Sequence, residues 1–222
     1  MSAKLAKHRV LIVDDHPMVR ERLAELIKAE PDLVVCGETE SRAQALHLVT
    51  LTHPDIVLLD LNLKDSHGTD VIKDIMAQEP RSRILVISMH DESLFAERAI
   101  RAGARGYITK QEATRSIMVA IRKVLAGELY LSEALAKKLM ADLVGGKQGP
   151  VVASVDLLSD RELQVLRLLG LGRSARQIAE DLHLELSTVE TYRTRMKDKL
   201  NLKDANELLQ YAINWMRTRG EV

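Results

Sequence analysis

Carboxylates follow two apolar runs that have the composition of buried strands. Residues 10–13 precede Asp14 and Asp15, and residues 56–59 precede Asp60. Four branched apolar residues in a row are typical of strands buried on both faces of a parallel sheet. If the two strands are neighbours, the three carboxylates converge at the carboxyl edge of the sheet, where open α/β folds bind ligands. Their mutual repulsion favours a bound cation, and oxygen ligands alone suit Mg²⁺ best.

Two further apolar runs end in groups that bind phosphate. Residues 84–87 precede Ser88, and residues 106–109 precede Lys110. A carboxylate nucleophile, a metal ion, a hydroxyl and an ammonium are the parts of an aspartyl-phosphate site. Taken alone, the aspartates after the first run fit equally well as caps of the next helix. The two additional strand ends favour the phosphoryl site.

The order and spacing of these residues resemble the receiver domain of bacterial response regulators, over residues 8–127. The resemblance implies that Asp60 accepts a phosphoryl group from a sensor histidine kinase. It also implies a Mg²⁺ site whose ligands are Asp15, Asp60 and the backbone carbonyl of Asn62, with Asp14 acting through water. Phosphorylation of Asp60 is therefore the expected control of this protein.

The same resemblance assigns roles to residues at the other two strand ends. Lys110 is expected to pair with the phosphate and Ser88 to follow it inward, while Tyr107 matches the aromatic residue that moves with the hydroxyl in this family. The chain departs from the family at Lys64 and Gln111, where proline is frequent. Neither departure touches the acidic residues, so the phosphoacceptor site remains the expectation.

Composition narrows the class of protein. The 222 residues carry 32 basic and 32 acidic side chains, so any argument for nucleic-acid binding must rest on local charge. The single cysteine, Cys36, permits no internal disulfide and favours a reducing compartment. No apolar run approaches the roughly 18 residues that a membrane helix needs, and the first residues lack the apolar core of a signal peptide. A cytoplasmic protein without membrane partners is expected, and the resemblance implies a bacterial one.

Strands alternate with amphipathic helices between residues 9 and 126. Five such units predict a flavodoxin-like (βα)5 doubly wound sheet with helices on both faces. A further strand is expected at 33–38. The helices are expected at 17–29, 41–52, 69–78, 92–102 and 113–126.

The glycine-rich stretch 145–150 is the clearest linker in the chain. A helix with an apolar side is expected just before it, at 132–144. The predicted organisation is therefore a receiver domain at 8–127, a linker with a helix at 128–155 and a small all-α domain at 156–222.

Four helix-start signals recur in the last third of the chain, each a capping residue with Glu or Gln three positions later. The spacing predicts a helix-turn-helix within a four-helix domain, although a generic helical bundle would show the same spacing. The signals are Ser159/Glu162, Ser174/Gln177, Ser187/Glu190 and Asp204/Glu207, and the helices are expected at 160–170, 175–182, 188–200 and 205–217.

The third of these helices has one apolar stripe, formed by Val189, Met196 and Leu200. Its other side is rich in threonine and basic residues, which suits contacts to DNA phosphates and base edges. A solvated charged face would look similar. The basic residues of this helix are Arg193, Arg195, Lys197 and Lys199.

The amino-acid sequence of this region resembles the LuxR-type helix-turn-helix over residues 156–217. The resemblance implies binding of double-stranded DNA, with Thr191 and Thr194 toward base edges. Arg195 and Lys199 are expected at phosphates, because basic residues that flank a groove-bound helix meet the backbone. The matching residues are Leu158–Glu162, Val165–Leu166, Ser174, Gln177–Ala179, Leu182, Ser187–Val189 and Lys199–Leu200.

Glu190 and Tyr192 stand where the LuxR-type family often has lysine and histidine. Capping of the helix by Glu190 together with Ser187 is favoured over a base contact by Glu190. The two departures bear on which DNA sequence is preferred rather than on DNA binding itself.

A receiver joined to this helical domain makes a response regulator of the NarL/FixJ class. The resemblance implies a promoter-binding transcription factor, not an enzyme, in which phosphorylation alters domain contacts and favours a homodimer. One alternative is a Mg²⁺-dependent phosphohydrolase, but the second acid of its usual Asp-x-Asp motif is replaced here by Asn62. The other alternative, DNA binding without phosphate control, is disfavoured by the intact acidic residues, Ser88 and Lys110.

Overall fold

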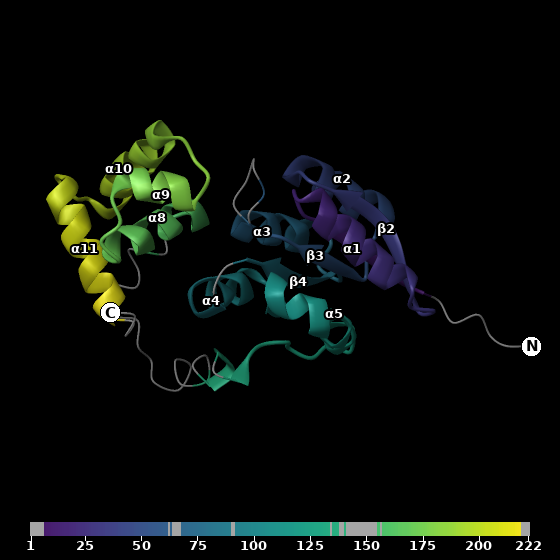
Figure 1. Cartoon of the computed structure of the whole chain (residues 1–222). Helices are drawn as coiled ribbons and strands as arrows, with labels where there is room; N and C mark the ends of the chain where they lie inside the picture. Colours follow the sequence, from purple (N-terminus) through teal and green to yellow (C-terminus); the bar gives the residue numbers. More distant parts are fainter. Residues whose placement is uncertain are drawn as a thin grey trace, which may run out of the picture. The chain divides into compact units, whose positions relative to one another are not determined.

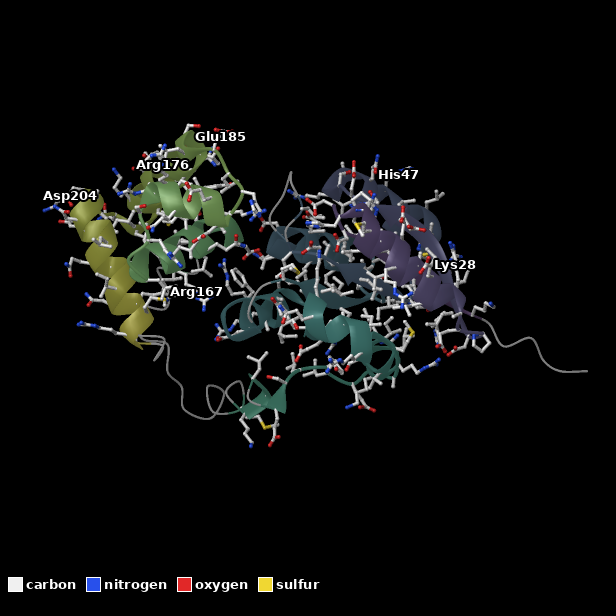
Figure 2. All side chains as sticks on the ribbon, in the orientation of Figure 1. Lys28, His47, Arg167, Arg176, Glu185 and Asp204 are labelled. Carbon is white, nitrogen blue, oxygen red and sulfur yellow. The ribbon has the colours of Figure 1, made fainter. Side chains whose placement is uncertain are left out.

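The computed structural model describes residues 7–61, 63, 68–89, 92–133, 135–137, 140, 155 and 157–218. The chain folds as two compact units, Met1–Gly145 and Gly146–Val222. Charged side chains of both signs are spread over the surfaces of the two units (Figure 2), in keeping with the zero net charge. No helix within the described ranges combines the length and the apolar character needed to cross a bilayer.

The first unit contains a five-stranded sheet in which every neighbouring pair of strands is parallel (Figure 1). The strand order is β2-β1-β3-β4-β5, which confirms the flavodoxin-like doubly wound fold. The strands are β1 (His8–Val13), β2 (Leu33–Thr39), β3 (Ile56–Leu59), β4 (Arg83–Ser88) and β5 (Gly106–Thr109).

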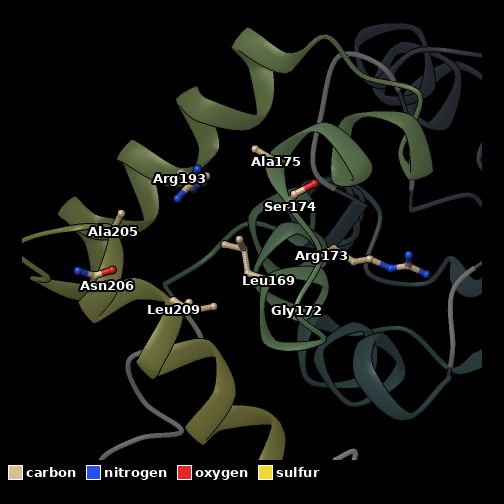
Figure 3. A pocket seen from close by; sticks show the side chains of 9 residues that line it. All are labelled: Leu169, Gly172, Arg173, Ser174, Ala175, Arg193, Ala205, Asn206 and Leu209. Carbon is tan, nitrogen blue, oxygen red and sulfur yellow. The ribbon is translucent and has the colours of Figure 1, made fainter.

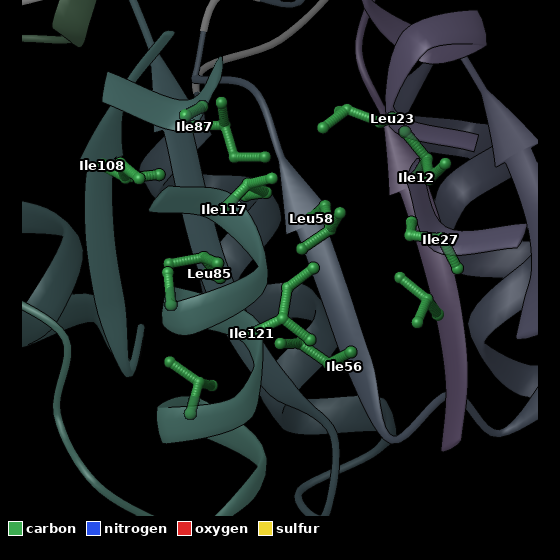
Figure 4. Close-up of a cluster of buried hydrophobic side chains, with 14 of the residues drawn as sticks. Ile12, Leu23, Ile27, Ile56, Leu58, Leu85, Ile87, Ile108, Ile117 and Ile121 are labelled. Carbon is green, nitrogen blue, oxygen red and sulfur yellow. The ribbon is translucent and has the colours of Figure 1, made fainter. Parts of the chain in front are cut away.

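Helices connect these strands and cover both faces of the sheet. The side chains of α1 and α5 share one buried cluster with alternate residues of the strands, among them Ile12 and Leu58 (Figure 4). The intervening strand residues, such as Leu11 and Val57, are fully buried on the opposite face. The helices are α1 (Pro17–Lys28), α2 (Arg42–Thr52), α3 (Gly68–Gln78), α4 (Glu92–Ala102) and α5 (Lys110–Leu125).

The start of α5 differs from the sequence-based expectation of residue 113. The helix begins at Lys110, because Thr109 and Glu112 form a capping box in which each side chain bonds the other residue's backbone N–H. This box satisfies two of the amide groups that a helix start leaves without a partner. It places Lys110 at the first position of α5, directly after β5.

The segment around Tyr130 extends the sheet beyond β5. The backbone N–H of Tyr107 donates to the carbonyl of Tyr130 at 2.9 Å, and the N–H of Tyr130 donates to the carbonyl of Arg105 at 3.0 Å. A Cβ on Gly106 would stand 3.0 Å from Cβ of Tyr130 and 2.9 Å from Cδ1 of Leu85. Residues at the start of the predicted linker therefore lie against the edge of the sheet, and only glycine fits opposite them.

The second unit is helical. Helix α8 (Asp160–Gly170) packs closely against α11 (Ala205–Thr218). A Cβ added to Gly170 would lie 2.8 Å from the carbonyl oxygen of Ala212. Helices α9 (Ala175–Asp181) and α10 (Leu186–Leu200) are joined by a short turn in which His183 has a φ of 53°. This arrangement confirms the predicted small all-α fold.

The start of α10 corrects the predicted capping by Ser187 and Glu190. The N-cap residue is Glu185, which makes no side-chain capping hydrogen bond, and the helix begins at Leu186. Glu190 instead accepts a hydrogen bond from Arg193 at 2.7 Å. The first turn of α10 is therefore set by the turn after α9 rather than by a capping box. Within the helix predicted at 132–144, residues 133, 135–137 and 140 are helical, and positions 134, 138–139 and 141–144 lie outside the described residues. The predicted domain boundaries remain a prediction.

We predict that Gly106→Ala loosens the Tyr130 segment. The new methyl group would press on Tyr130 and Leu85, and overpacking of this kind costs about 1–3 kcal/mol of unfolding free energy. Hydrogen exchange at the Tyr107 amide should accelerate, because its acceptor on Tyr130 is displaced.

Gly127→Ala is the matched control for this experiment. Its added Cβ meets nothing within 4 Å, and its cost arises only from a left-handed φ of 88°. Faster exchange at Tyr107 in both variants to the same extent would show that close packing against Gly106 does not hold the segment.

Candidate functional site

Parallel pairing of β1 and β3 brings two carboxylates to one edge of the sheet. Val13 is the register partner of Leu59, so the residues that follow them, Asp14 and Asp60, lie side by side. The N–H of Asp60 donates to the carbonyl of Val13 at 2.8 Å and continues the ladder by one residue. Both side chains are almost fully buried, as the sequence predicts for strand ends within the sheet.

Lys110 bridges these two carboxylates. Its Nζ atom lies 2.7 Å from Oδ2 of Asp60 and 2.7 Å from Oδ2 of Asp14. The lysine side chain is only 8% exposed, so the ammonium sits inside the acidic cluster rather than above it. The three predicted strand ends therefore meet in one acidic pocket, which is formed by Asp14, Asp60 and Lys110 together with Asp15 and His16.

The charges in this pocket shift one another's protonation. Burial, and then the neighbouring charge of Asp60, raise the pKa of Asp14 above its ordinary value. Burial by itself lowers the pKa of Lys110, but the charge of Asp60 and the close contacts of the ammonium with both carboxylates outweigh burial and raise it. The lysine is therefore held as a cation, and the pocket contains more negative charge than this cation balances.

Asp15 and His16 complete the described part of the cluster. Nδ1 of His16 lies 2.7 Å from Oδ1 of Asp15 and 3.1 Å from Oδ1 of Asp14. One ligand atom from each of Asp14, Asp15, His16 and Asp60 falls within 4.8 Å of the others. Four potential donors thus converge on a volume of the size that one divalent cation occupies.

The donor set fits Mg²⁺. Oδ2 of Asp14 and Oδ1 of Asp15 are buried, and they accept no well-formed hydrogen bond from the residues that the structure describes. Lys110 and His16 lie 2.7 Å from these oxygens, yet the contacts are close charge contacts rather than directed hydrogen bonds. Carboxylate oxygens left in this state are what a hard cation requires. Asn62, whose backbone carbonyl is the other predicted ligand, lies outside the described residues.

The remaining predicted residues of this site are placed on β4 and β5. Ser88 is the last residue of β4 and is fully buried, and it pairs in register with Thr109 at the end of β5. Tyr107, in the middle of β5, is 1% exposed. The structure therefore brings the hydroxyl strand end to the same edge of the sheet as the lysine, with the aromatic side chain inside the fold.

Sequence reasoning missed three residues that shape this site. His16 follows directly on Asp14 and Asp15, and this position in the sequence could have indicated that it lies beside them. Glu112 follows Thr109 at capping-box spacing, and this spacing was sufficient to predict that α5 begins at Lys110. The carbonyl of Asp14 also accepts a hydrogen bond from Arg20 at 2.5 Å, which nothing in the sequence indicates.

In the helical unit, α10 presents an exposed face on the side opposite its buried residues. Val189 and Met196 are fully buried, whereas Thr191, Thr194 and Arg195 are exposed. Positions 194 and 195 follow position 191 by three and four residues, so each lies on the same side of the helix as Thr191. The hydroxyl of Thr191 donates to the carbonyl of Ser187 at 2.9 Å.

Ion pairs engage half of the basic residues on α10. Arg193 is partly buried and bonds Glu190. Lys199 donates to Oε2 of Glu162 at 2.6 Å, so this predicted phosphate contact points toward α8 in the structure. Neither Arg195 nor Lys197 forms an ion pair with any residue in the described ranges. The free positive charge on this helix is therefore smaller than its composition suggests.

Glu162 holds two helices together. Its carboxylate also accepts the backbone N–H of Ser159 at 2.7 Å, and its side chain is 2% exposed. Burial raises the pKa of Glu162, but the hydrogen bond from Lys199 and the bonds from Ser159 outweigh burial and lower it. The start of α8 is therefore tied to the end of α10 by a charged pair.

A shallow hollow of about 350 Å³ lies among the same helices (Figure 3). It lies where the end of α8, the start of α9, α10 and the start of α11 meet, and it shares no residue with the acidic pocket. Arg193 lies on the α10 side of this hollow (Figure 3). Its lining residues are Leu169, Gly172, Arg173, Ser174, Ala175, Arg193, Ala205, Asn206 and Leu209.

We predict that Lys199→Met destabilises the helical unit in a pH-dependent manner. Because the folded pKa of Glu162 is lowered, its ion pair stabilises the fold above the ordinary value of 4.5 and is lost as the pH falls through the folded pKa. The loss at neutral pH should be about 1–2 kcal/mol, discounted for the exposed end of the lysine. The difference from the wild type should shrink as the pH is lowered below 4.5.

Urea unfolding, monitored by tryptophan fluorescence, measures this loss of stability in the helical unit. Trp215, the only tryptophan in the chain, is buried in α11. Lys197→Met, on the same helix, removes an equal charge without removing the ion pair. Equal destabilisation by both substitutions at every pH would assign the effect to lost charge in general rather than to the contact with Glu162.

Each of the two units matches a known protein family. Residues 10–122 match the response regulator receiver domain family, and residues 156–212 match the bacterial regulatory proteins of the luxR family. The chain is 31% identical over 209 residues to the oxygen regulatory protein NreC of Staphylococcus haemolyticus, covering 92% of this chain and 96% of that protein. It is 34% identical over 213 residues to the DNA-binding transcriptional activator DevR/DosR of Mycobacterium tuberculosis, covering 95% and 96%.

A solved structure supports the same assignment. The two-component response regulator of the LuxR family from Aurantimonas sp. SI85-9A1 superposes with a TM-score of 0.57 at 36% identity, covering 63% of this chain and 99% of that one. Family matches on both units, together with relatives that span nearly the whole chain, leave one conclusion. The chain belongs to the response regulators of two-component systems, in the branch that carries a receiver domain followed by a LuxR-type helix-turn-helix domain.

Proposed function

We propose that Asp60 is the phosphoacceptor of this regulator and that a sensor histidine kinase is its phosphodonor. The observation that carries this proposal is the contact of Lys110 with both Asp60 and Asp14, 2.7 Å from each. A cation in this position marks the place where the negative charge of an incoming phosphoryl group would be balanced. The family assignment supplies the class of donor.

The proposed transfer is a displacement at phosphorus. An ionised oxygen of Asp60 forms the new P–O bond while the P–N bond of the kinase phosphohistidine breaks, and the electron pair returns to the imidazole nitrogen of the kinase. Lys110 then exchanges a carboxylate partner for a phosphoryl oxygen. Ser88, from the end of the adjacent strand, donates its hydroxyl to another phosphoryl oxygen, and Tyr107 follows that movement.

Mg²⁺ is the proposed cofactor of this step. Asp15, Asp60 and the backbone carbonyl of Asn62 would hold it, with Asp14 acting through water, and it would supply positive charge that lets two anions approach. Support comes from the buried carboxylate oxygens that lack well-formed hydrogen bonds. Turnover of outside phosphate esters is not part of the proposal, because Asn62 stands where such hydrolases often have a second acid.

We also propose that α10 binds double-stranded promoter DNA. The relative DevR/DosR is described as a DNA-binding transcriptional activator, and it aligns with 95% of this chain. Thr191 and Thr194 lie on the exposed face of α10 and would meet base edges, with Arg195 beside them at a phosphate. Glu190 is the weakest base-reading candidate, since it pairs with Arg193.

Lys199 is proposed as a phosphate contact of lower priority than Arg195, because it already binds Glu162. Its ammonium is bonded to Glu162 yet remains partly exposed, so it would reach a phosphate only while keeping or exchanging that partner. The proposal also includes a homodimer in the phosphorylated state. It includes a cytoplasmic location as well, because the protein must meet both a kinase and DNA. Leu208 and Trp215 are buried within their own unit, whereas Leu209 is exposed on α11.

We predict that Asp60→Asn abolishes phosphorylation while the fold survives. The amide keeps the shape of the side chain but cannot act as the nucleophile. Incubation of the full chain with acetyl phosphate and Mg²⁺, followed by intact mass measurement, should show one phosphoryl adduct on the wild type and none on the variant.

Asp55→Asn is the matched control, because Asp55 precedes the same strand at its opposite end. This variant should be phosphorylated like the wild type. An adduct of equal abundance on Asp60→Asn would place the acceptor on another residue and remove the basis of the proposal.

We predict that Arg195→Ala weakens binding to duplex DNA of any sequence and flattens its salt dependence. A lost phosphate contact should reduce the slope of log K against log salt by about 0.9, without changing sequence preference. A salt titration of the full chain on a random-sequence duplex, read by fluorescence anisotropy, measures this slope.

Arg217→Ala removes the same charge from the last turn of α11 and is the control. Its slope should equal that of the wild type. An unchanged slope for Arg195→Ala, or an equal change for both variants, would take Arg195 out of the interface.

A further inference from the structure

The hollow among the helices of the second unit is lined mainly by apolar groups. Leu169 of α8 is buried, and Leu209 of α11, which is 38% exposed, also lines it. Ala175 and Ala205 contribute only methyl groups. Sites for small molecules are mostly apolar with a few polar groups, and their volumes begin at about 300 Å³. A hollow of about 350 Å³ is therefore large enough for a small ligand.

Two polar side chains in the lining are available to a ligand. The hydroxyl of Ser174 is not, because it exchanges hydrogen bonds with Gln177 in the capping box of α9. The side-chain amide of Asn206 forms no hydrogen bond with any residue in the described ranges. The other available group is the guanidinium of Arg193.

Arg193 has one donor without a partner. Its Nη1 atom bonds Glu190 at 2.7 Å, whereas its Nε atom is buried and has no hydrogen-bond partner in the described part of the chain. Native proteins rarely leave a buried N–H in this state. Nε and Nη2 form an edge that can bind a carboxylate through two hydrogen bonds. The pair with Glu190 joins two partly exposed side chains and contributes little, so the guanidinium can turn toward a bound anion.

Arg193 does not belong to the side of α10 that is proposed to meet DNA. It is two residues from Thr191 and two from Arg195, which is about 200° around the axis from each. It lies closer to the buried stripe, since Val189 and Met196 are four residues before it and three after it. A DNA phosphate bound beside Thr191 would therefore not reach the unpaired donor.

The charges around the hollow favour an anion. None of its nine lining residues is acidic. The start of α11 also lines it, and the positive end of a helix dipole stabilises negative charge. Two acids lie at this helix start but are not in the lining, and both already accept backbone N–H groups: Asp204 from Asn206 at 2.8 Å and Glu207 from Lys203 at 2.7 Å.

We propose that this hollow is a binding site for a small monocarboxylate with an apolar body. The carboxylate bonds the guanidinium of Arg193 and the side-chain amide of Asn206, and the apolar body packs against Leu169 and Leu209. The ligand thereby joins α10 to α8 and α11. The site is independent of the phosphoryl site, with which it shares no residue.

The test is a titration of the ¹⁵N-labelled full chain with 4-phenylbutyrate, followed by two-dimensional NMR. Saturable shifts are expected at the Gly172 and Asn206 amides and at the Arg193 Nε–H signal, with a dissociation constant of about 1 mM for a ligand of this size. The neutral 4-phenylbutanamide has the same apolar body and should bind at least about tenfold more weakly, because it lacks the charge. Inorganic phosphate, an anion without an apolar body, should not saturate the same signals.

Two arginines of the lining provide a variant and its control. Arg193→Met keeps an apolar stem and should weaken binding of 4-phenylbutyrate at least about tenfold, the effect of losing a charged hydrogen bond. Arg173→Met should bind like the wild type, because Arg173 extends away from the other lining residues and lies 3.7 Å from Asp181 (Figure 3). Arg193→Lys keeps the charge but not the planar donor edge, so it should also bind more weakly than the wild type.

Several results would overturn the proposal. These are the absence of saturable shifts in the wild type, equal shifts with the carboxylate and its amide, and equal losses in Arg193→Met and Arg173→Met. If Arg193→Met does not give the spectrum of a folded protein, unchanged affinity in Arg193→Lys decides against the role of Arg193. Displacement of 4-phenylbutyrate by a random-sequence duplex would identify the hollow as a contact for DNA phosphate instead.

Discussion

The contact of Lys110 with two buried carboxylates is the interaction on which the receiver unit depends. Asp14 and Asp60 are forced together by strand pairing, and burial makes their mutual repulsion expensive. A lysine at the first position of a helix is itself unfavourable, because the helix dipole is positive there. Lys110 therefore gains nothing from α5 and is held by the carboxylates, while the capping box of Thr109 fixes the helix around it. The same geometry leaves the ammonium ready to change partners when a new anion arrives.

A related constraint operates in the helical unit, where charge serves packing and recognition at once. Glu162 caps α8 and binds Lys199 of α10, so one carboxylate orients the helix that is proposed to enter DNA. Glu190 holds Arg193 in the same helix. These pairs reduce the free positive charge of α10, which agrees with the zero net charge of the whole chain. Non-specific attraction to DNA should accordingly be weak, and recognition must depend more on the exposed face around Thr191 and Thr194.

The fold and the centre of the acidic pocket were predictable from sequence because both follow from local patterns. Apolar runs that stop at charged residues locate strand ends, and parallel order then brings Asp14, Asp60 and Lys110 together. The start of α10 was predicted wrongly, because Ser187 and Glu190 have capping-box spacing but the turn from α9 delivers the helix two residues earlier than Thr188, at Leu186. The bond between Glu162 and Lys199 joins residues 37 positions apart, and no local rule pairs them.

The pairing of Tyr130 with β5 is a contact within the first unit that no sequence motif predicts. Tyr107 donates its backbone N–H to Tyr130, and Arg105 accepts the N–H of Tyr130 in return. Gly106, between them, leaves no room for any side chain larger than hydrogen. A displacement of β5 at Tyr107 therefore either carries the Tyr130 segment with it or breaks two backbone hydrogen bonds at a cost of about 1–3 kcal/mol. Movement of β5 at the phosphoryl site is therefore coupled to the Tyr130 segment, which follows α5 in the chain.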